Sequence, residues 1–153
     1  MKSNPKSRRP SATPPLGADL LSRIARDPAK RAAGMAAFFR AMSLWKATSA
    51  EARRILGSPS QRRFRNWQAG TIGPVPPDTI RRISYVLGIF EALQILYSDE
   101  ALADSWPRRP NRAFDDRAPL QRMSEGGVSG LHAVRRCLDR VRNNVAGDES
   151  GRE

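Results

Sequence analysis

The stretch from Ser49 to Gly70, SAEARRILGSPSQRRFRNWQAG, carries the start and stop signals of two short helices in succession. Thr48 and Glu51 have the spacing of a capping box, in which each side chain accepts a hydrogen bond from the other's backbone amide. Gly57 can take the left-handed backbone conformation that ends many helices. The pattern predicts a first helix over residues 49–56.

The second helix of this stretch is predicted from about Pro59 to Ala69. Ser58 precedes it as a capping residue, and a proline is tolerated at the first helical position because its missing N–H would have had no partner there. At about 100° per residue, Phe64 and Trp67 share one face of this helix. Two short helices joined by a tight turn predict a helix-turn-helix.

The opposite face of the second helix carries the residue types that read DNA bases. From a helix lying in the major groove, Arg can donate two hydrogen bonds to guanine, and Gln or Asn can pair twice with adenine. We therefore predict that this helix contacts DNA through Ser60, Gln61, Arg62, Arg63, Arg65 and Asn66.

The net charge of +12 is confined to the first half of the chain. Residues 1–77 contain 15 Lys and Arg against 3 Asp and Glu, whereas residues 78–153 contain 12 of each kind. A basic surface attracts nucleic-acid phosphates, and a balanced surface suits a protein partner. The alternative is that the excess of arginine only keeps the chain soluble.

The segments around the stretch predict an all-α fold. Residues 1–16 are rich in proline and cations, and we expect a disordered basic tail. A short apolar helix begins near Leu20, and Asp27 starts a second helix that runs to about Trp45 as a support behind the helix-turn-helix.

The most apolar residues of the chain follow a proline-rich linker. They predict two helices, one that starts near Pro77 and ends at Gly88 and another that continues from Ile89. We expect these central helices to form the core and to be the face through which the chain forms a homodimer.

Residues 105–119, SWPRRPNRAFDDRAP, contain three prolines, which exclude a regular helix or a central strand. Trp106 and Phe114 nevertheless indicate an ordered loop, and the favoured interpretation of Trp106 is that it packs the loop on the central helices. A last helix is predicted over residues 128–143, followed by a flexible tail over residues 146–153.

A series of residues after Asp78 has a recognisable order and spacing. They are Leu87, Gly88, Trp106, Pro110, Asn111, Phe114, Pro119, Leu120, Gly127, Val134 and Leu138. In this order they resemble the toxin-binding domain of the MbcA/ParS/Xre antitoxin family, and the upstream segment that ends at Trp67 and Gly70 resembles an Xre-type helix-turn-helix. The resemblance covers roughly residues 29–143.

This resemblance implies an antitoxin of a type II toxin-antitoxin system. The implied partner is a RES-domain toxin that destroys NAD. The antitoxin would block the toxin's active site through a toxin-binding domain, residues 89–145, and repress its own operon through a DNA-binding domain, residues 17–88. The expected toxin-binding residues are Trp106, Arg108, Arg109, Asn111, Arg112, Phe114, Arg117, Arg136 and Arg140.

The loop departs from the family pattern in two places. Asp115, Asp116 and Arg117 replace a glycine-rich turn, and Pro107 stands where an aliphatic residue is expected. Asp tolerates left-handed backbone, so the turn can persist. One loop arginine is expected to enter a phosphate-binding pocket of the toxin, and the alternative is a solvated arginine loop.

The sequence offers no catalytic constellation. His132 and Cys137 are single representatives of their kinds, and neither a glycine-rich phosphate loop nor a metal-ligand spacing accompanies them. We therefore expect no enzyme activity, no cofactor and no metal. The lone cysteine fits a reducing compartment, and no apolar run approaches the roughly 18 residues of a membrane span, so a cytoplasmic protein is expected.

Two other functions fit the residues. One is a stand-alone helix-turn-helix transcriptional regulator whose C-terminal half dimerises or senses a ligand. The other is an interaction protein whose helix-turn-helix no longer binds DNA. A lone gene without a toxin-like neighbour would favour the first, and DNA association that is weak and insensitive to salt would favour the second.

Overall fold

The computed structural model describes residues 18–150, and every regular element in that range is a helix, which confirms the all-α fold. The tail predicted over residues 1–16 and the last three residues of the chain lie outside the described range. None of the helices within the range combines the length and the apolarity that crossing a membrane requires.

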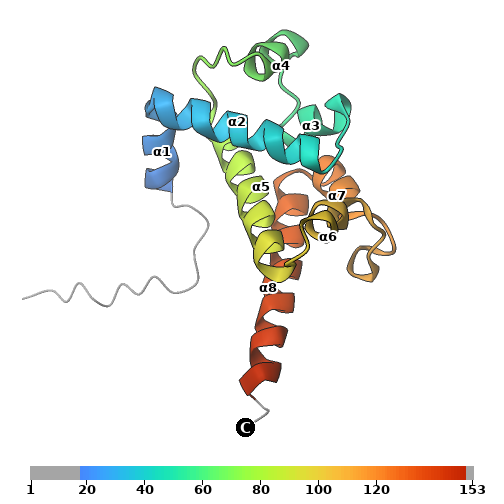
Figure 1. Cartoon of the computed structure of the whole chain (residues 1–153). Coiled ribbons are helices and arrows are strands. Elements are labelled where there is room, and N and C mark those ends of the chain that lie inside the picture. The colour runs from blue at the N-terminus through green and yellow to red at the C-terminus, as the bar shows by residue number, and fades with distance from the viewer. Residues whose placement is uncertain (1–17, 151–153) are drawn as a thin grey trace, which may run out of the picture.

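The first two helices meet at a capping aspartate. They are α1 (Ala18–Arg26) and α2 (Pro28–Leu44). Oδ1 of Asp27 accepts hydrogen bonds from the amides of Ala29 (3.0 Å) and Lys30 (3.3 Å), which fixes the start of α2 where the sequence predicts it. Figure 1 shows α2 lying across one end of α5, as a support for the helices that follow.

Two short helices joined by a turn come next, α3 (Ser49–Ile55) and α4 (Gln61–Gln68). The predicted capping box of α3 is confirmed, because Thr48 Oγ1 accepts from the amide of Glu51 (3.1 Å) and Glu51 Oε1 accepts from the amide of Thr48 (2.8 Å). Gly57 takes the predicted left-handed conformation, with φ of 98°.

The start of α4 differs from the prediction. Its capping residue is Ser60, whose Oγ accepts from the amide of Arg63 (3.2 Å), and the helix begins after it instead of at Pro59. Ser58 has a left-handed backbone with φ of 56°, so it belongs to the turn. Arg53 Nε donates to the carbonyl oxygen of Pro59 (2.6 Å) and holds this longer turn against α3.

The central apolar segment forms one helix, α5 (Pro77–Leu96), where the sequence predicts two. Gly88 does not end a helix. The guanidinium of Arg135 from α8 lies against it and occupies the space that a side chain at this position would fill. The glycine therefore marks a close approach between two helices, and the domain boundary predicted between residues 88 and 89 falls inside a continuous helix.

The rest of the chain wraps round the end of α5 and returns along it. The elements are α6 (Glu100–Ser105), the 3-10 turns η2 (Trp106–Arg108) and η3 (Arg112–Phe114), α7 (Pro119–Glu125) and α8 (Gly127–Ser150). The last helix continues seven residues beyond its predicted end and includes residues 146–150 of the predicted tail. In Figure 1 its C-terminal part projects away from the other helices.

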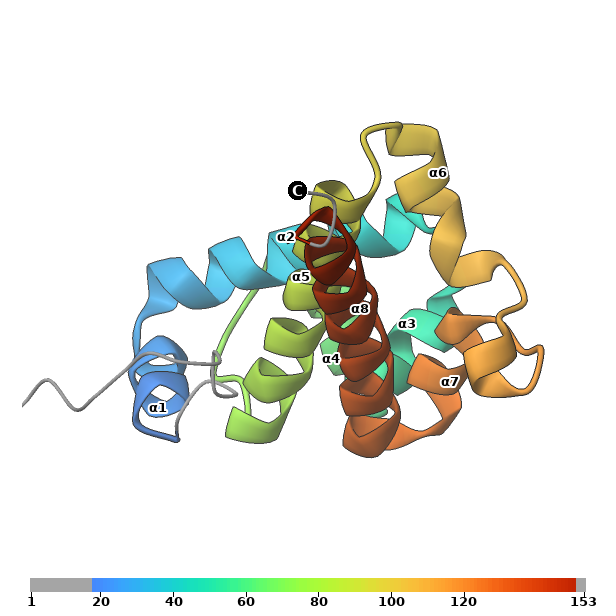
Figure 2. The ribbon, with the colours of Figure 1, turned by 90° about the horizontal axis from the view of Figure 1, so that it is seen from below.

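A single core joins both halves of the chain. α8 packs against α5 and α7, α2 packs against α5, and α3 packs against α7. Figure 2 shows α3 and α7 side by side, next to the N-terminal part of α8. Trp45, at the end of α2, is 1% exposed and its ring centroid lies 6.3 Å from that of Phe90 in α5. The first helices and the last are thus parts of one hydrophobic cluster.

Candidate functional site

α4 lies at one edge of the molecule (Figure 1), and its outer face carries exposed polar side chains. Phe64 and Trp67 turn inward and are each 3% exposed, and the ring of Phe64 packs edge-on against Phe39 with centroids 5.6 Å apart. The candidate DNA-binding residues are all exposed, namely Ser60, Gln61, Arg62, Arg63, Arg65 and Asn66. The predicted apolar back and polar front of this helix are confirmed.

Two of these six residues also stabilise the helix itself. Ser60 provides the N-cap. The guanidinium of Arg63 lies over the ring of Trp67, 5.8 Å from its centroid, which is within the range of a cation–π interaction. The side chains of the other four make no hydrogen bond or ion pair with the described part of the chain, so their polar groups are free for a ligand.

The α4 arginines have no acidic neighbour to neutralise them. Among the described residues, every ion pair involves an arginine outside α4, and α4 contains three arginines and no acid. An open groove of about 360 Å³ follows one side of the helix. Its lining combines α4 with the loop after it: Ser60, Arg62, Arg63, Asn66, Trp67, Thr71, Gly73 and Pro74. The surface is suited to an anionic, elongated ligand.

The second candidate site, the arginine loop of residues 109–117, is ordered by a pair of hydrogen bonds at its base. The amide of Asn111 donates to the carbonyl oxygen of Arg117 (3.1 Å), and the amide of Asp116 donates to the carbonyl oxygen of Asn111 (3.0 Å). The Asn111 side chain accepts from the amide of Ala113 (2.9 Å). Asp115 and Asp116 are left-handed, with φ of 55° and 64°, as their residue type permits.

The aromatic residues attach this loop to the core. Trp106 is 8% exposed and belongs to the central hydrophobic cluster, which confirms its favoured interpretation as a packing residue. Phe114 is half-buried against the same cluster. The loop is therefore ordered, as predicted, and its backbone is held in place before any partner binds.

The arginines of the loop differ in how strongly they are held. Arg109 donates to the carbonyl oxygen of Leu102 (3.3 Å), and Arg117 forms an exposed ion pair of 3.8 Å with Glu125. The side chain of Arg112, at the tip, makes no hydrogen bond or ion pair with the described residues. On α8, the candidates Arg136 and Arg140 are exposed, and no described contact joins either of them to the loop.

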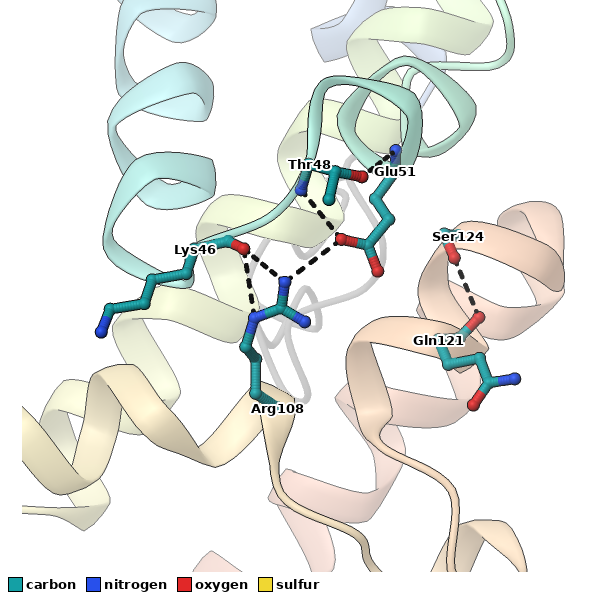
Figure 3. Close-up of polar contacts among 6 residues, drawn as sticks. All are labelled: Lys46, Thr48, Glu51, Arg108, Gln121 and Ser124. Carbon is teal, nitrogen blue, oxygen red and sulfur yellow. Dashed lines mark hydrogen bonds and ion pairs between the residues drawn. The ribbon is translucent and has the colours of Figure 1, made fainter.

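Arg108 points back into the chain instead of outward (Figure 3). Its Nε donates to the carbonyl oxygen of Lys46 at 3.1 Å, and its Nη2 also bonds that oxygen and lies 3.4 Å from Oε1 of Glu51. No feature of the sequence predicts this contact. Its partners lie 62 and 57 positions away, and no local pattern signals such a distance.

Within the described range, His132 and Cys137 both lie on α8. His132 is exposed on α8 and shares a hydrogen bond of 3.3 Å with the hydroxyl of Tyr85. Burial raises the pKa of the Cys137 thiol, and the nearby positive charge of Arg140 opposes this in part. No group of three or more candidate metal ligands occurs in this part of the chain.

Comparison with known proteins identifies the second half of the chain. Residues 92–143, from the end of α5 into α8, match the family described as the antitoxin Xre/MbcA/ParS C-terminal toxin-binding domain. A protein of Sinorhizobium fredii, named uncharacterized protein y4oB, is 39% identical over 116 residues, which cover 76% of this chain and 89% of that protein. No solved structure matches. The matched range contains the arginine loop and its packing on the core. The second half of the chain therefore carries an Xre/MbcA/ParS toxin-binding domain, which indicates an antitoxin of a toxin-antitoxin system with a toxin as its partner.

Proposed function

We propose that this antitoxin neutralises a RES-type, NAD-degrading toxin by covering its active site, and that it represses its own operon by laying α4 in the major groove of the operator. The observation that carries the proposal is the presence of two different exposed surfaces on one core. The α4 outer face is basic and unpaired, whereas the arginine loop lies within the matched toxin-binding domain.

The operator-binding part is supported by the chemistry of α4. Arg62 and Arg65 are exposed and free of acidic partners, which suits contacts to phosphates or to guanine, and Asn66 can pair with adenine. A reading helix commonly works in a symmetric dimer, with half-sites about 34 Å apart. We propose a homodimer formed through the central helices. Ile95 of α5 is 57% exposed and offers such a contact.

The operator test compares two double variants that each remove two positive charges. In Arg62→Ala/Arg65→Ala, operator binding should fall at least about tenfold, and the slope of log affinity against log salt should shrink by about two if both residues touch phosphates. Arg136→Ala/Arg140→Ala removes the same charge from α8 and should leave operator binding unchanged. Equal losses in both variants would reduce the effect to net charge and refute the assignment of α4.

The toxin-binding part is supported by the loop geometry. Because Arg109 and Arg117 are engaged at the sides of the loop and Arg108 is engaged behind it, Arg112 is the arginine best placed to enter a pocket that binds the phosphates of NAD. Arginine suits that role because its planar guanidinium pairs with phosphate oxygens through two hydrogen bonds.

The toxin test begins with the product of the neighbouring gene. This protein should arrest growth when expressed alone and co-purify with the antitoxin, and its NAD hydrolysis should be inhibited by the antitoxin in vitro. Arg112→Ala should weaken inhibition about 30-fold, the loss typical of a central interface residue. Arg142→Ala, an exposed arginine outside the candidate site, is the control. A neighbour that is harmless, or one that does not co-purify, would refute the antitoxin proposal and leave the stand-alone regulator or the interaction protein as the explanation.

A further inference from the structure

The contact made by Arg108 joins the two functional surfaces. Arg108 ends η2 and directly precedes the arginine loop, so it belongs to the toxin-binding half. Its guanidinium instead reaches the turn between α2 and α3, where it binds the carbonyl oxygen of Lys46 and approaches Glu51 (Figure 3). One side chain of the toxin-binding half is thus seated at the beginning of the predicted helix-turn-helix.

Both partners of Arg108 determine how α3 starts. Lys46 has a left-handed backbone with φ of 57°, which turns the chain from α2 into α3. Oε1 of Glu51 is the same oxygen that accepts from the Thr48 amide in the capping box, so one carboxylate oxygen both caps α3 and faces Arg108. Removing the guanidinium leaves this carboxylate and the Lys46 carbonyl oxygen without their cation.

α3 is also linked to the start of α4. Arg53 of α3 holds the carbonyl oxygen of Pro59 just before α4, and the carbonyl oxygen of Leu56 accepts a hydrogen bond of 3.5 Å from the Thr79 hydroxyl of α5. α7 packs on α3 from the side of the toxin-binding domain. A change in the seating of α3 therefore reaches the α4 outer face through a few residues.

The contact is also sensitive to what covers it. The side chains of Arg108 and Glu51 are 38% and 19% exposed, so water weakens their attraction in the free antitoxin. A toxin bound to the arginine loop would lie close to Arg108, because Arg108 directly precedes this loop. Excluding water there strengthens the ion pair, because charges attract more strongly at lower dielectric.

We infer that Arg108 is a positioning residue for operator binding, through which a toxin on the arginine loop tightens the cap of α3 and raises the affinity of α4 for the operator. This inference rests on the proposed function, since it links the two proposed binding events. Such coupling is reciprocal, so the operator should raise toxin affinity by the same factor.

The test measures operator affinity of the full chain with and without saturating toxin. For the wild type, toxin should tighten operator binding about fivefold or more, the lower range of measured coupling. Arg108→Ala should bring this ratio close to one, and Arg108→Lys should not restore it, because an ammonium lacks the planar fork that spans both oxygens. Arg142→Ala, an exposed arginine of the same half, should retain the wild-type ratio.

A second perturbation approaches the contact from the other side. Glu51→Gln keeps an oxygen for the Thr48 amide but removes the charge that faces Arg108, so it should reduce the ratio while the α3 cap survives. In Arg108→Ala, hydrogen exchange at the amides of Glu51 and Ala52 should quicken several-fold relative to Arg142→Ala. That measurement needs neither toxin nor operator.

The outcomes separate this inference from the proposed function. A wild type that binds no toxin or no operator defeats the proposed function, whereas the exchange measurement still tests the contact. A wild type that binds both with a ratio near one, or an Arg108→Ala variant that keeps the ratio, overturns the role of Arg108 and leaves the proposed function standing. Unchanged exchange in Arg108→Ala also overturns it.

Discussion

Gly130 should be intolerant of any side chain because two backbones meet there. It lies in the first turns of α8, is buried, and faces the end of α7. A Cβ at this position would overlap the carbonyl oxygen of Arg122 and lie 3.2 Å from its carbonyl carbon and 3.8 Å from the Cα of Met123. The obstacle is backbone, which cannot rotate aside as a flexible side chain can.

Two opposing effects set the change in the free energy of unfolding that Gly130→Ala causes. Overpacking of this kind costs about 1–3 kcal/mol, and a backbone obstacle places Gly130→Ala near the upper end. Alanine returns about 1 kcal/mol through its higher helix propensity. The net loss is about 2 kcal/mol. For a chain of this size it lowers the melting temperature by about 4–8 °C.

The assay is thermal unfolding followed by far-ultraviolet circular dichroism, with Gly147→Ala as the matched control. Gly147 lies in the same helix, and no atom lies within 4 Å of the position its Cβ would take. The control should therefore gain about 0.5 kcal/mol, because fraying near the helix end reduces the benefit. If Gly130→Ala proved as stable as Gly147→Ala, α7 and α8 could not approach each other as described.

Three further predictions concern stability and reactivity. Thr48→Ala should lower the free energy of unfolding, measured in urea, by about 1 kcal/mol because the α3 cap is lost. Thr48→Ser keeps a hydroxyl that can cap the helix, so it should retain most of this stability. Trp106→Ala should lower the free energy of unfolding by about 3–5 kcal/mol because the indole is buried in the core. The control is Leu102→Ala, which should cost less than about 0.5 kcal/mol because Leu102 is 45% exposed. Near-equal losses in the two variants would contradict the packing of the loop. Burial raises the pKa of the Cys137 thiol, so at about pH 8 iodoacetamide should alkylate it more slowly in the folded than in the unfolded chain. Because the folded chain then holds the thiol proton more tightly, stability should fall as the pH rises from the unfolded pKa through the folded one.

The elements that the sequence predicted well are those with local signals. The caps at Asp27 and Thr48 depend on side chains that reach amides two or three residues along, and such spacings are visible in the sequence. The two faces of α4 follow from helical periodicity, so the burial of Phe64 and Trp67 was predictable.

The predictions that differ from the structure depend on contacts between distant segments. Gly88 looks like a helix terminus until the Arg135 side chain from α8 is placed against it. Ser58 and Ser60 are equally good capping residues by type. Arg53 of α3 donates to the Pro59 carbonyl oxygen, which keeps Pro59 in the turn and leaves Ser60 as the cap of α4.

In the candidate site, too, the features with local signals were predictable and those that depend on distant contacts were not. The exposure of the α4 arginines and the order of the arginine loop were both expected from residue types and spacing. The inward direction of Arg108 was not, because a run of arginines in a loop carries no sign of which one meets a distant carbonyl oxygen.

The shared core has a consequence for how the antitoxin is lost in a cell. Because α3 packs on α7 and a single hydrophobic cluster spans the chain, we expect the two halves to unfold together. A protease that captures one opened molecule would then destroy the arginine loop and the α4 outer face in the same event. Under the proposed function, turnover of this protein would release its toxin and reopen its own gene at once, with no intermediate fragment that performs only one of the two tasks.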